Sequence, residues 1–383
     1  MSVVEASGWR PLLPLVLGTM ASQALLVVLA PTIVAIAADL GTSVAAAGQA
    51  RTLTAAVAIV ASLAISTRAD ALPVSRLLQV GAVLALAACA AVAGSTTTTL
   101  FLSSHALVGL ALALLLSGGF GGLAAFPAER RAWATGYVAS ANALAWILVN
   151  PIAAGLTERF SWRVAQAVPA AVAVAALMTA GAAATSPAAR AAASWWAPLR
   201  VTSARRWIAA ETAGYAGWTA LLTFAGAFFI QRLGVRESVT GWLLAAGAAA
   251  YLVASTRSGA LVRQVPRRRL AAASALAMAV LLPVMLAARS VAAALVVFCL
   301  TALAAGTRTP ASAGLGLEQL PGHPAVMMAA RTAATQAGYL LGAVVGGAVI
   351  ALSGYRALGL VLGAVLAVSA WLMRRVDDPA AAR

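Results

Sequence analysis

The sequence predicts an all-α polytopic membrane protein with twelve transmembrane helices arranged as two six-helix repeats. Hydrophobic residues make up 62% of the 383 residues and charged residues only 9%, and the mean hydropathy is +0.94. A soluble domain carries about 25% charged residues. Apolar stretches of about 20 residues recur from Leu12 to Leu372, and each is long enough to cross a hydrocarbon core of roughly 30 Å. Composition and segment length therefore both predict membrane-spanning helices.

An internal repeat divides the chain into two equivalent halves, and such repeats decide the fold before any local feature does. Superposing the polar break at Pro73 on the one at Pro266 sets an offset of 193 residues (266 minus 73). Three further pairs align at this offset without a gap: Leu40-Gly41 with Leu233-Gly234, Gly48 with Gly241, and Trp162-Arg163 with Tyr355-Arg356. Four landmarks in one register indicate a duplicated chain.

The apolar runs place the spans in order along the two halves. We expect spans at about 10–37, 43–65, 74–94, 99–124, 132–156 and 163–184, and then at 207–230, 238–262, 268–288, 291–315, 326–352 and 355–374. The first run is too long for a signal-peptide core, so we expect it to be retained as a span. The resulting organisation is an N-terminal bundle over 1–186, a cytoplasmic linker over 187–206 and a C-terminal bundle over 207–383.

The distribution of arginine predicts the orientation. The net charge is +16, and every basic residue is an arginine. These arginines sit singly or in twos and threes in the breaks between spans, which is the positive-inside pattern and not a nucleic-acid-binding patch. With both termini in the cytoplasm, 17 arginines lie inside and six outside. We therefore expect both termini to be cytoplasmic and no nucleic-acid partner.

The breaks between spans resemble those of the major facilitator superfamily. In that family the loop after span two reads roughly Gly-x-Leu-x-Asp-Arg-x-Gly-Arg-Arg. Asp70 and Arg76 fall on its acidic and late basic positions, and Gly259, Leu261, Arg267 and Arg268 match in the second copy. Ser66, Ala71, Pro73, Arg263 and Pro266 depart from the pattern.

Three other stretches carry the same resemblance: Ile36 to Gly41, Phe160 to Arg163, and Ala329 to Gly347 with glycines at 338, 342, 346 and 347. The last is similar to span eleven of the sugar-efflux and drug:proton antiporter branch. The resemblance implies twelve spans, a small-molecule substrate near the bilayer midplane and a rocking motion of the two halves. It also implies a monomer, coupling to protons, and no cofactor or metal. The Arg-only, Ala-rich composition suggests a GC-rich bacterial genome, so we expect a bacterial inner membrane.

Polar residues inside spans are costly, so they are the candidates for function. Arg51 lies about eight residues into span two, roughly 12 Å from its outer end. Two interpretations stand side by side for Arg51. One is a contact to an anionic or carbonyl group of the substrate, and the other is a structural role in the outer half of the N-terminal bundle.

Three charged residues lie toward the cytoplasmic side of the C-terminal spans. Arg308 is in span ten, Arg331 is near the start of span eleven, and Glu211 is a few residues into span seven. One or both arginines are expected to pair with Glu211, because burying one member of a charge pair alone is expensive. The alternative for either arginine is snorkelling to cytoplasmic phosphates.

Two helix faces combine polar and aromatic residues. Glu211, Tyr215 and Trp218 are spaced i, i+4, i+7 and share one face, which suits a cavity for a partly apolar solute. Asn142 and Trp146 make a similar case in span five. These residues, together with Gln336, complete the expected substrate-binding set. Gln336 is about 140° around its helix from Arg331, so both cannot point straight at one ligand.

The expected proton-coupling residues are Glu211, Asp39 and His105. Histidine titrates near neutral pH, although a lone membrane histidine is more often a hydrogen-bonded structural residue. His105 stands where many family members carry a basic residue in span four, so the resemblance does not extend to their proton relay. We interpret Asp70 and Arg76 as gating residues, with topology signalling as the alternative.

The leading functional hypothesis is a secondary active transporter that exports a small molecule in exchange for protons. The runner-up is an uptake permease or facilitator for a small organic or inorganic anion, suggested by three intramembrane arginines against one glutamate. A polytopic enzyme would need a cluster of catalytic side chains, but the two histidines, His105 and His323, lie on opposite sides. The chain has neither a Gly-x-x-x-x-Gly-Lys loop nor any lysine, which excludes ATP-driven pumping by this chain. A non-transporting membrane sensor is the remaining alternative.

Overall fold

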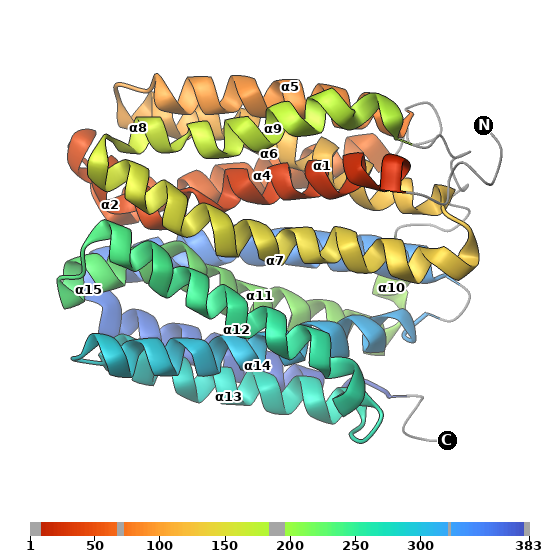
Figure 1. The fold of residues 1–383 in the computed structure, drawn as a ribbon. Helices are drawn as coiled ribbons and strands as arrows, with labels where there is room; N and C mark the ends of the chain where they lie inside the picture. Colours follow the sequence, from red (N-terminus) through yellow and green to blue (C-terminus); the bar gives the residue numbers. More distant parts are fainter. Residues whose placement is uncertain (1–8, 67–72, 184–195, 321–322, 379–383) are drawn as a thin grey trace. The chain divides into compact units, whose positions relative to one another are not determined.

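The computed structural model describes residues 9–66, 73–183, 196–320 and 323–378. Within these ranges the chain forms long helices and no strand (Figure 1). The chain divides into two compact units. Unit 1 holds residues 1–190 with 236–245, and unit 2 holds residues 191–235 with 246–383. Each unit is described by itself.

Unit 1 contains the first six expected spans. Its helices are α1 (Trp9–Val27), α2 (Leu29–Asp39), α3 (Val44–Gly48), α4 (Ala50–Ser66), α5 (Val74–Ala93), α6 (Thr98–Gly121), η3 (Gly122–Ala125), α7 (Ala128–Arg159), α8 (Trp162–Ala165), α9 (Ala167–Thr179) and η4 (Ala180–Ala182). The first turns of α12 also belong to unit 1. There, Glu158 accepts a hydrogen bond from the Ser238 amide at 2.8 Å and pairs with Arg236.

Unit 2 contains the remaining spans. Its helices are α10 (Ala197–Arg200), α11 (Thr202–Ala227), the π-helical η5 (Phe228–Arg232), the rest of α12 (Glu237–Val262), α13 (Arg267–Ala287), α14 (Val291–Leu317) and α15 (Pro324–Met373). The expected linker 187–206 falls partly on residues 184–195, outside the described ones. Span seven begins at Thr202, five residues earlier than expected, and its first turns therefore take up the end of the expected linker.

Eleven helices in the described ranges are long and apolar enough to cross a membrane. The last of them, α15, has 50 residues, about 75 Å at 1.5 Å per residue and far more than a hydrocarbon core of roughly 30 Å needs. It is broken at Gly354, whose φ of 74° and ψ of −173° are non-helical. This glycine divides α15 into the expected spans eleven and twelve. Together with the other long apolar helices, it makes the protein a multi-pass membrane protein.

The repeat inferred from sequence recurs in the local backbone. Gly41 and Gly234 both have positive φ, at 60° and 67°, in the left-handed region that favours glycine. Pro73 begins α5 as its N-cap, and Pro266 does the same for α13. A further pair at the same offset is Thr97 and Ser290, whose hydroxyls cap α6 and α14. Such caps satisfy amides that a helix start leaves without partners.

The glycines of span eleven allow α15 to approach α11 closely. A Cβ added at Gly342 would lie 2.5 Å from the Ala216 carbonyl oxygen, and one at Gly338 would lie 2.5 Å from the Tyr215 Cβ. Residues without a side chain let helix backbones pack at short range, which is the usual basis of close helix pairing in membranes. The spacing of these two glycines thus serves packing against span seven.

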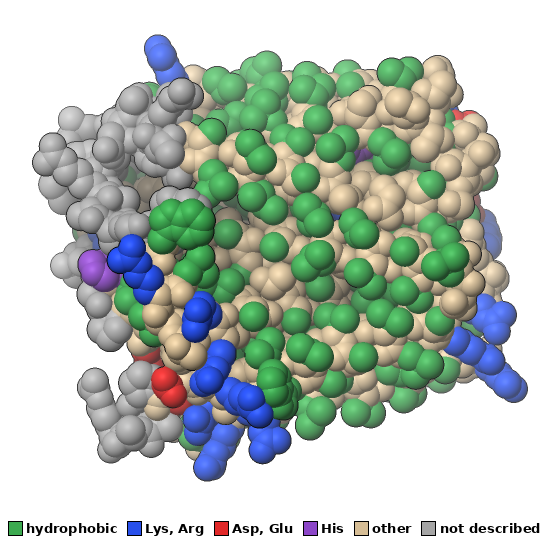
Figure 2. Space-filling view, turned by 180° about the vertical axis from the view of Figure 1, so that it is seen from behind, with side chains coloured by type: hydrophobic (Ala, Val, Ile, Leu, Met, Phe, Trp, Pro, Cys, Tyr) green, Lys and Arg blue, Asp and Glu red, His purple; other side chains and the backbone are tan. Residues whose placement is uncertain are grey.

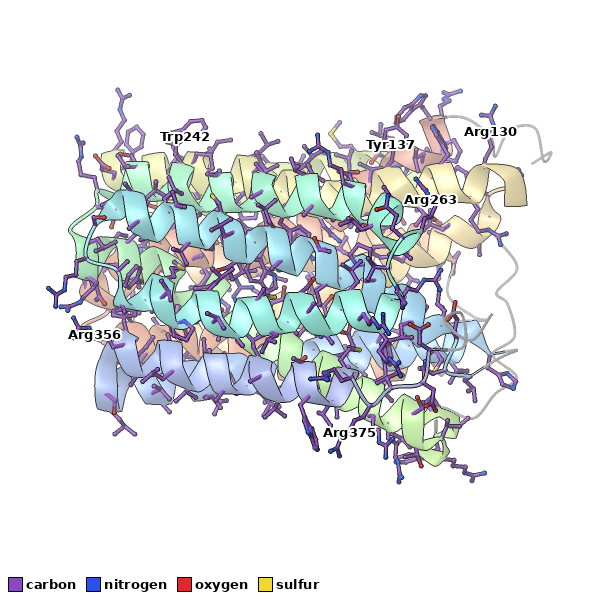
Figure 3. All side chains as sticks on the ribbon, turned by 90° about the horizontal axis from the view of Figure 1, so that it is seen from below. Arg130, Tyr137, Trp242, Arg263, Arg356 and Arg375 are labelled. Atoms are coloured by element: carbon purple, nitrogen blue, oxygen red, sulfur yellow. The ribbon has the colours of Figure 1, made fainter. Side chains whose placement is uncertain are left out.

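Apolar and charged side chains separate along the helices. In Figure 2, hydrophobic side chains cover the flanks of the helices and arginine side chains gather toward their ends. Large apolar side chains are strongly exposed, as at Met178 (81%) and Leu352 (85%), which is what lipid-facing positions require. Within unit 2, Arg356 lies at one end of the helices, and Arg263 and Arg375 lie toward the other (Figure 3).

Candidate functional site

Unit 2 holds an ion pair inside the span region. Glu211 on α11 is fully buried, and its Oε1 accepts a hydrogen bond of 2.6 Å from Nη2 of Arg308 on α14, whose side chain is 3% exposed. The expectation that an arginine pairs with Glu211 is thus met in the structure. Burying both charges is costly unless their remaining donors and acceptors are also satisfied, so the neighbouring groups decide how firmly the pair is held.

Three polar groups that the sequence interpretation did not single out hold this pair. Ser312 lies one turn beyond Arg308 and donates from Oγ to Oε1 of Glu211 at 2.8 Å. Arg308 Nη2 also donates to the Ala210 carbonyl at 3.1 Å and lies 3.5 Å from the hydroxyl of Ser369. The i, i+4 spacing of Arg308 and Ser312 on one helix face was the available sequence signal. For Ser369, in span twelve, no such signal existed.

Gly214 is a further part of the site that the sequence interpretation missed. A Cβ added there would overlap the guanidinium of Arg308. Gly214 lies three residues after Glu211, so the same face of α11 offers a carboxylate and, one turn on, the space into which Arg308 fits. The space reserved by this glycine makes the enclosed position of Arg308 possible.

Arg331 is the outer member of the same cluster. Its Nε lies 3.5 Å from Oε2 of Glu211 without forming a hydrogen bond. Its Nη2 donates to the Tyr215 hydroxyl at 2.8 Å. The Arg331 side chain is 19% exposed, in contrast to that of Arg308. The guanidinium carbons of Arg308 and Arg331 lie 5.8 and 5.9 Å from the centre of the Tyr215 ring, within the range of a cation–π contact.

The aromatic stripe of α11 continues beyond Tyr215. Trp218 is buried and stacks on Tyr251 of α12, with ring centres 6.1 Å apart and planes 13° apart. Gln336 is also buried on α15, on a different side of that helix from Arg331. The structure therefore brings Glu211, Tyr215, Arg308 and Arg331 together, with the Trp218 pair on the same face of α11.

In unit 1, Arg51 is 2% exposed and donates from Nη2 to the Leu26 carbonyl at 2.5 Å. This carbonyl lies beside the break between α1 and α2. Pro31, just beyond the break, has no amide hydrogen to donate to the Val27 carbonyl, which follows that of Leu26. The Arg51 guanidinium lies 6.0 Å from the centre of the Trp146 ring. The structural role expected as one alternative is visible in these contacts, and the substrate contact stays a proposal.

Trp146 connects α7 to the first span. Its indole Nε1 lies 3.4 Å from the Gln23 side-chain oxygen, and its carbonyl accepts a hydrogen bond from Asn150 at 2.6 Å. Asn142, one turn before Trp146, has a buried side-chain oxygen without a hydrogen-bond partner. Gln23 and Asn150 were not predicted as site residues, because each is a single amide within a long apolar run.

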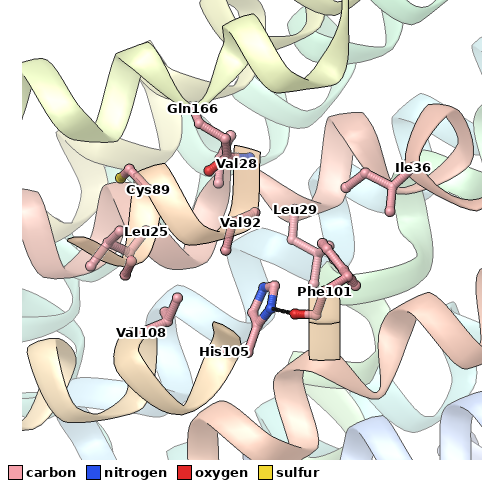
Figure 4. A pocket seen from close by; sticks show the side chains of 11 residues that line it. Leu25, Val28, Leu29, Ile36, Cys89, Val92, Phe101, His105, Val108 and Gln166 are labelled. Carbon is pink, nitrogen blue, oxygen red and sulfur yellow. Dashed lines mark hydrogen bonds between the residues drawn. The ribbon is translucent and has the colours of Figure 1, made fainter. Parts of the chain in front are cut away.

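His105 lines a small apolar cavity of unit 1 (Figure 4). Its Nδ1 lies 2.7 Å from the Phe101 carbonyl, and because a carbonyl can only accept, this nitrogen carries a hydrogen. The cavity is lined by apolar side chains together with His105 and Gln166, and it has room for roughly one water molecule. The geometry is that of a hydrogen-bonded structural histidine, and no acidic side chain lines the cavity.

The other expected coupling and gating residues lie at span ends. Asp39 pairs with Arg163 at 2.6 Å and accepts a hydrogen bond from the Trp162 indole at 3.2 Å. Its side chain is 43% exposed. This pair joins the end of span one to the start of span six. Arg76 is exposed on α5, and Asp70 lies outside the described residues.

Comparisons with known proteins agree with this architecture. Residues 207–383 match the sequence model of the Major Facilitator Superfamily. A comparison with curated protein sequences finds no match. Among solved structures, a mutant of the peptide transporter POT in complex with sulfate has a TM-score of 0.79 at 13% identity, covering 99% of this chain and 100% of that one.

Two other solved structures show the same fold over nearly the whole chain. A D-xylose-proton symporter has a TM-score of 0.79 at 15% identity, covering 97% of this chain and 98% of that one. A POT family transporter in complex with 5-aminolevulinic acid has a TM-score of 0.80 at 11% identity, covering 100% of both chains. The sequence match to the Major Facilitator Superfamily thus covers the C-terminal bundle, and the whole chain shares the fold of these solved transporters.

Proposed function

We propose that the protein is a secondary active transporter that couples movement of a small molecule to protons through Glu211, by alternating access of two six-helix bundles at 1–186 and 207–383. The observation that carries this proposal is the buried carboxylate of Glu211, held by Arg308 at 2.6 Å and Arg331 at 3.5 Å. An ionisable group inside a span marks an ion or substrate pathway by default. Among the described acidic residues, Glu211 alone is fully buried.

The arrangement suits coupling because Glu211 has two positively charged partners at unequal distances, Arg308 at 2.6 Å and Arg331 at 3.5 Å. A proton on this carboxylate weakens its attraction to both arginines, so a change of protonation state changes which contacts α11 makes with α14 and α15. Ion-pair exchange of this kind biases a two-state equilibrium only by the difference in interaction energy between the states. A buried pair provides a large difference because its charges are poorly screened.

The direction of transport that we propose is efflux in exchange for protons. It rests on the resemblance of Ala329 to Gly347 to the efflux branch, and one of the solved structures with the same fold is by contrast a proton symporter. The second candidate function is an uptake permease or facilitator for a small anion. The excess of arginine over glutamate in unit 2 favours this second candidate.

The remaining expectations belong to the same proposal. The protein acts as a monomer in a bacterial inner membrane, with both termini in the cytoplasm. Arg51, Asn142, Trp146 and Gln336 contribute to substrate binding. His105 and Asp39 are auxiliary coupling candidates, supported less by geometry than Glu211 is. Asp70 and Arg76 act at the cytoplasmic gate.

The test is proton-coupled flux in proteoliposomes that contain a pH-sensitive dye. Sugars, neutral amphiphiles and small anions are screened for dissipation of an imposed pH gradient. We expect at least one solute to move protons in the wild type, Glu211→Gln to stop the proton signal, and Glu237→Gln, an acid at the outer end of α12, to leave it unchanged. Solute movement without a proton signal, or coupling that survives Glu211→Gln, contradicts the proposal.

A further inference from the structure

The polar cluster of unit 2 carries more positive than negative charge. Arginine carries a positive charge in proteins, so Arg308 and Arg331 supply two positive charges. Glu211 supplies one negative charge, which leaves the cluster with a surplus of one positive charge. Other acidic side chains in the described part of unit 2 lie at the cytoplasmic ends of helices. Glu318 pairs with Arg267, and Asp378 accepts from the Arg268 amide. Within a membrane-spanning bundle, a surplus charge is costly unless a counter-ion approaches it.

The two arginines differ in their access to such a counter-ion. Arg308 is 3% exposed, and its Nη2 is directed at Glu211, Ala210 and Ser369. Arg331 is 19% exposed, has only an ion-pair distance of 3.5 Å to Glu211, and donates one hydrogen bond to a neutral phenol. Glu211 and Arg308 thus neutralise each other, and the surplus charge resides on Arg331.

We infer that Arg331 binds the anionic group of the transported solute, and that this solute is a small organic anion with an apolar or aromatic body. The guanidinium offers the planar fork that matches a carboxylate, sulfonate or phosphonate. The Tyr215 ring lies 5.9 Å from the Arg331 guanidinium carbon, and one turn further along α11 Trp218 stacks on Tyr251, so this face of α11 offers aromatic groups suited to an aromatic body. The inference rests on the proposed function in that the protein moves a solute at all.

The same charge count sets the sign of coupling between the anion and a proton. The charged groups facing Glu211 are Arg308 from α14 and Arg331 from α15, with the phenols of Tyr215 and Tyr251 near Arg331. The arginines of α13 lie in its first turn, at the cytoplasmic end. The cluster carries one positive charge as it stands, two with a proton on Glu211, none with an anion on Arg331, and one with both.

Each ligand therefore favours the other. A proton on Glu211 releases Arg331 to the anion, and an anion on Arg331 leaves Glu211 with one arginine partner in place of two. Linkage makes this effect reciprocal. Anion and proton binding therefore strengthen each other, which favours the second candidate function, transport of a small anion, over exchange of the solute for protons.

The test is equilibrium binding to the purified full-length protein in detergent, measured by calorimetry. The probes are benzoate and benzenesulfonate, which stay anionic in both mildly acidic and mildly alkaline buffer, and the neutral control is benzamide. We expect at least one anion to bind and benzamide not to bind, with tighter anion binding in the acidic buffer. Arg331→Gln is expected to weaken binding about tenfold or more, the usual size of a lost hydrogen bond to a charged group.

Three further variants separate charge from structure. Arg331→Lys keeps the charge without the fork and is expected to bind between the wild type and Arg331→Gln. Arg356→Gln, an exposed arginine at the opposite end of unit 2 from Arg263 (Figure 3), is expected to bind like the wild type. Glu211→Gln mimics the protonated acid, so it is expected to bind the anion in both buffers with equal affinity. Elution as a single species in gel filtration checks that each variant is folded.

Binding of neither anion, binding that survives Arg331→Gln, or wild-type binding that is equal in both buffers overturns the inference. These outcomes are distinct from failure of the proposed function. Anion binding that depends on Arg331 without any flux in proteoliposomes contradicts transport and leaves the anion site standing. Proton-coupled flux of a neutral solute without anion binding contradicts the anion site and leaves the proposed transport function standing.

Discussion

Replacing Glu211 by leucine removes the counter-ion of a buried arginine. Arg308 is 3% exposed, so its charge cannot regain water without opening the bundle. Breaking a buried pair by removal of one partner costs about 3–5 kcal/mol. Arg308→Met is expected to cost less, about 1–3 kcal/mol, the range for a buried polar group that loses a partner. The difference arises because Glu211 then still has Arg331 at 3.5 Å and the Ser312 hydroxyl.

The double variant Glu211→Leu/Arg308→Met completes the cycle. It restores the cluster to the single positive charge of the wild type, and replacing both members of a buried pair by apolar groups is often close to neutral. We therefore expect the double variant to be more stable than Glu211→Leu alone. The assay is the thermal unfolding midpoint of the purified protein in detergent, where Glu211→Leu is expected to lower the midpoint on the order of 10 °C.

Two results would refute this reasoning. The first is a Glu211→Leu midpoint no lower than that of Arg308→Met, which would mean that Arg331 does not compensate the glutamate. The second is a double variant as unstable as Glu211→Leu, which would mean that the cost arises from packing and not from an unpaired charge. Both comparisons use differences between variants, which are sounder than absolute stabilities.

Two further predictions concern packing and capping, both measured as the unfolding midpoint in detergent. Gly342→Ala places a Cβ 2.5 Å from a carbonyl oxygen of α11 and is expected to cost about 1–3 kcal/mol of stability. Gly155→Ala, with open space around it, is the control and is expected to be neutral. Equal unfolding midpoints for the two variants contradict the close packing. Asp378→Ala removes the carboxylate that accepts a hydrogen bond from the Arg268 amide at 2.9 Å. This amide lies at the start of α13, where Pro266 provides no side-chain cap, so the variant is expected to cost about 1 kcal/mol of stability. An unchanged midpoint would show that the C-terminal segment does not stabilise α13.

The sequence predicted the spans well because span length is fixed by the thickness of the hydrocarbon core, which any apolar run must match. Span seven, expected at about 207–230, begins at Thr202 in the structure because polar residues such as Arg205 and Arg206 continue α11 beyond its apolar stretch. The break between spans eleven and twelve was placed correctly, although there the helices join through a single non-helical residue, Gly354.

The candidate site was predictable only in part. Pairing of Glu211 with an arginine followed from the cost of burying a lone charge, and this reasoning needs no structure. The hydrogen-bond partner of Arg51 could not be predicted in this way. It is the main-chain carbonyl of Leu26, and every residue has such a carbonyl whatever its side chain. The contacts of Ser369, which reaches Arg308 and Ala210 from another span, could not be predicted either.

The sequence by itself determined the number of spans, the duplication and the need for an arginine partner at Glu211, because each of these follows from the free energy of placing a segment or a charge in hydrocarbon. Only the tertiary structure decided which arginine is enclosed and which is accessible. Arg308 fits the space left by Gly214, and Arg331 remains 19% exposed beside Tyr215. That distinction depends on how α11, α14 and α15 pack, and side-chain packing between distant segments is not encoded in the hydropathy of any one of them.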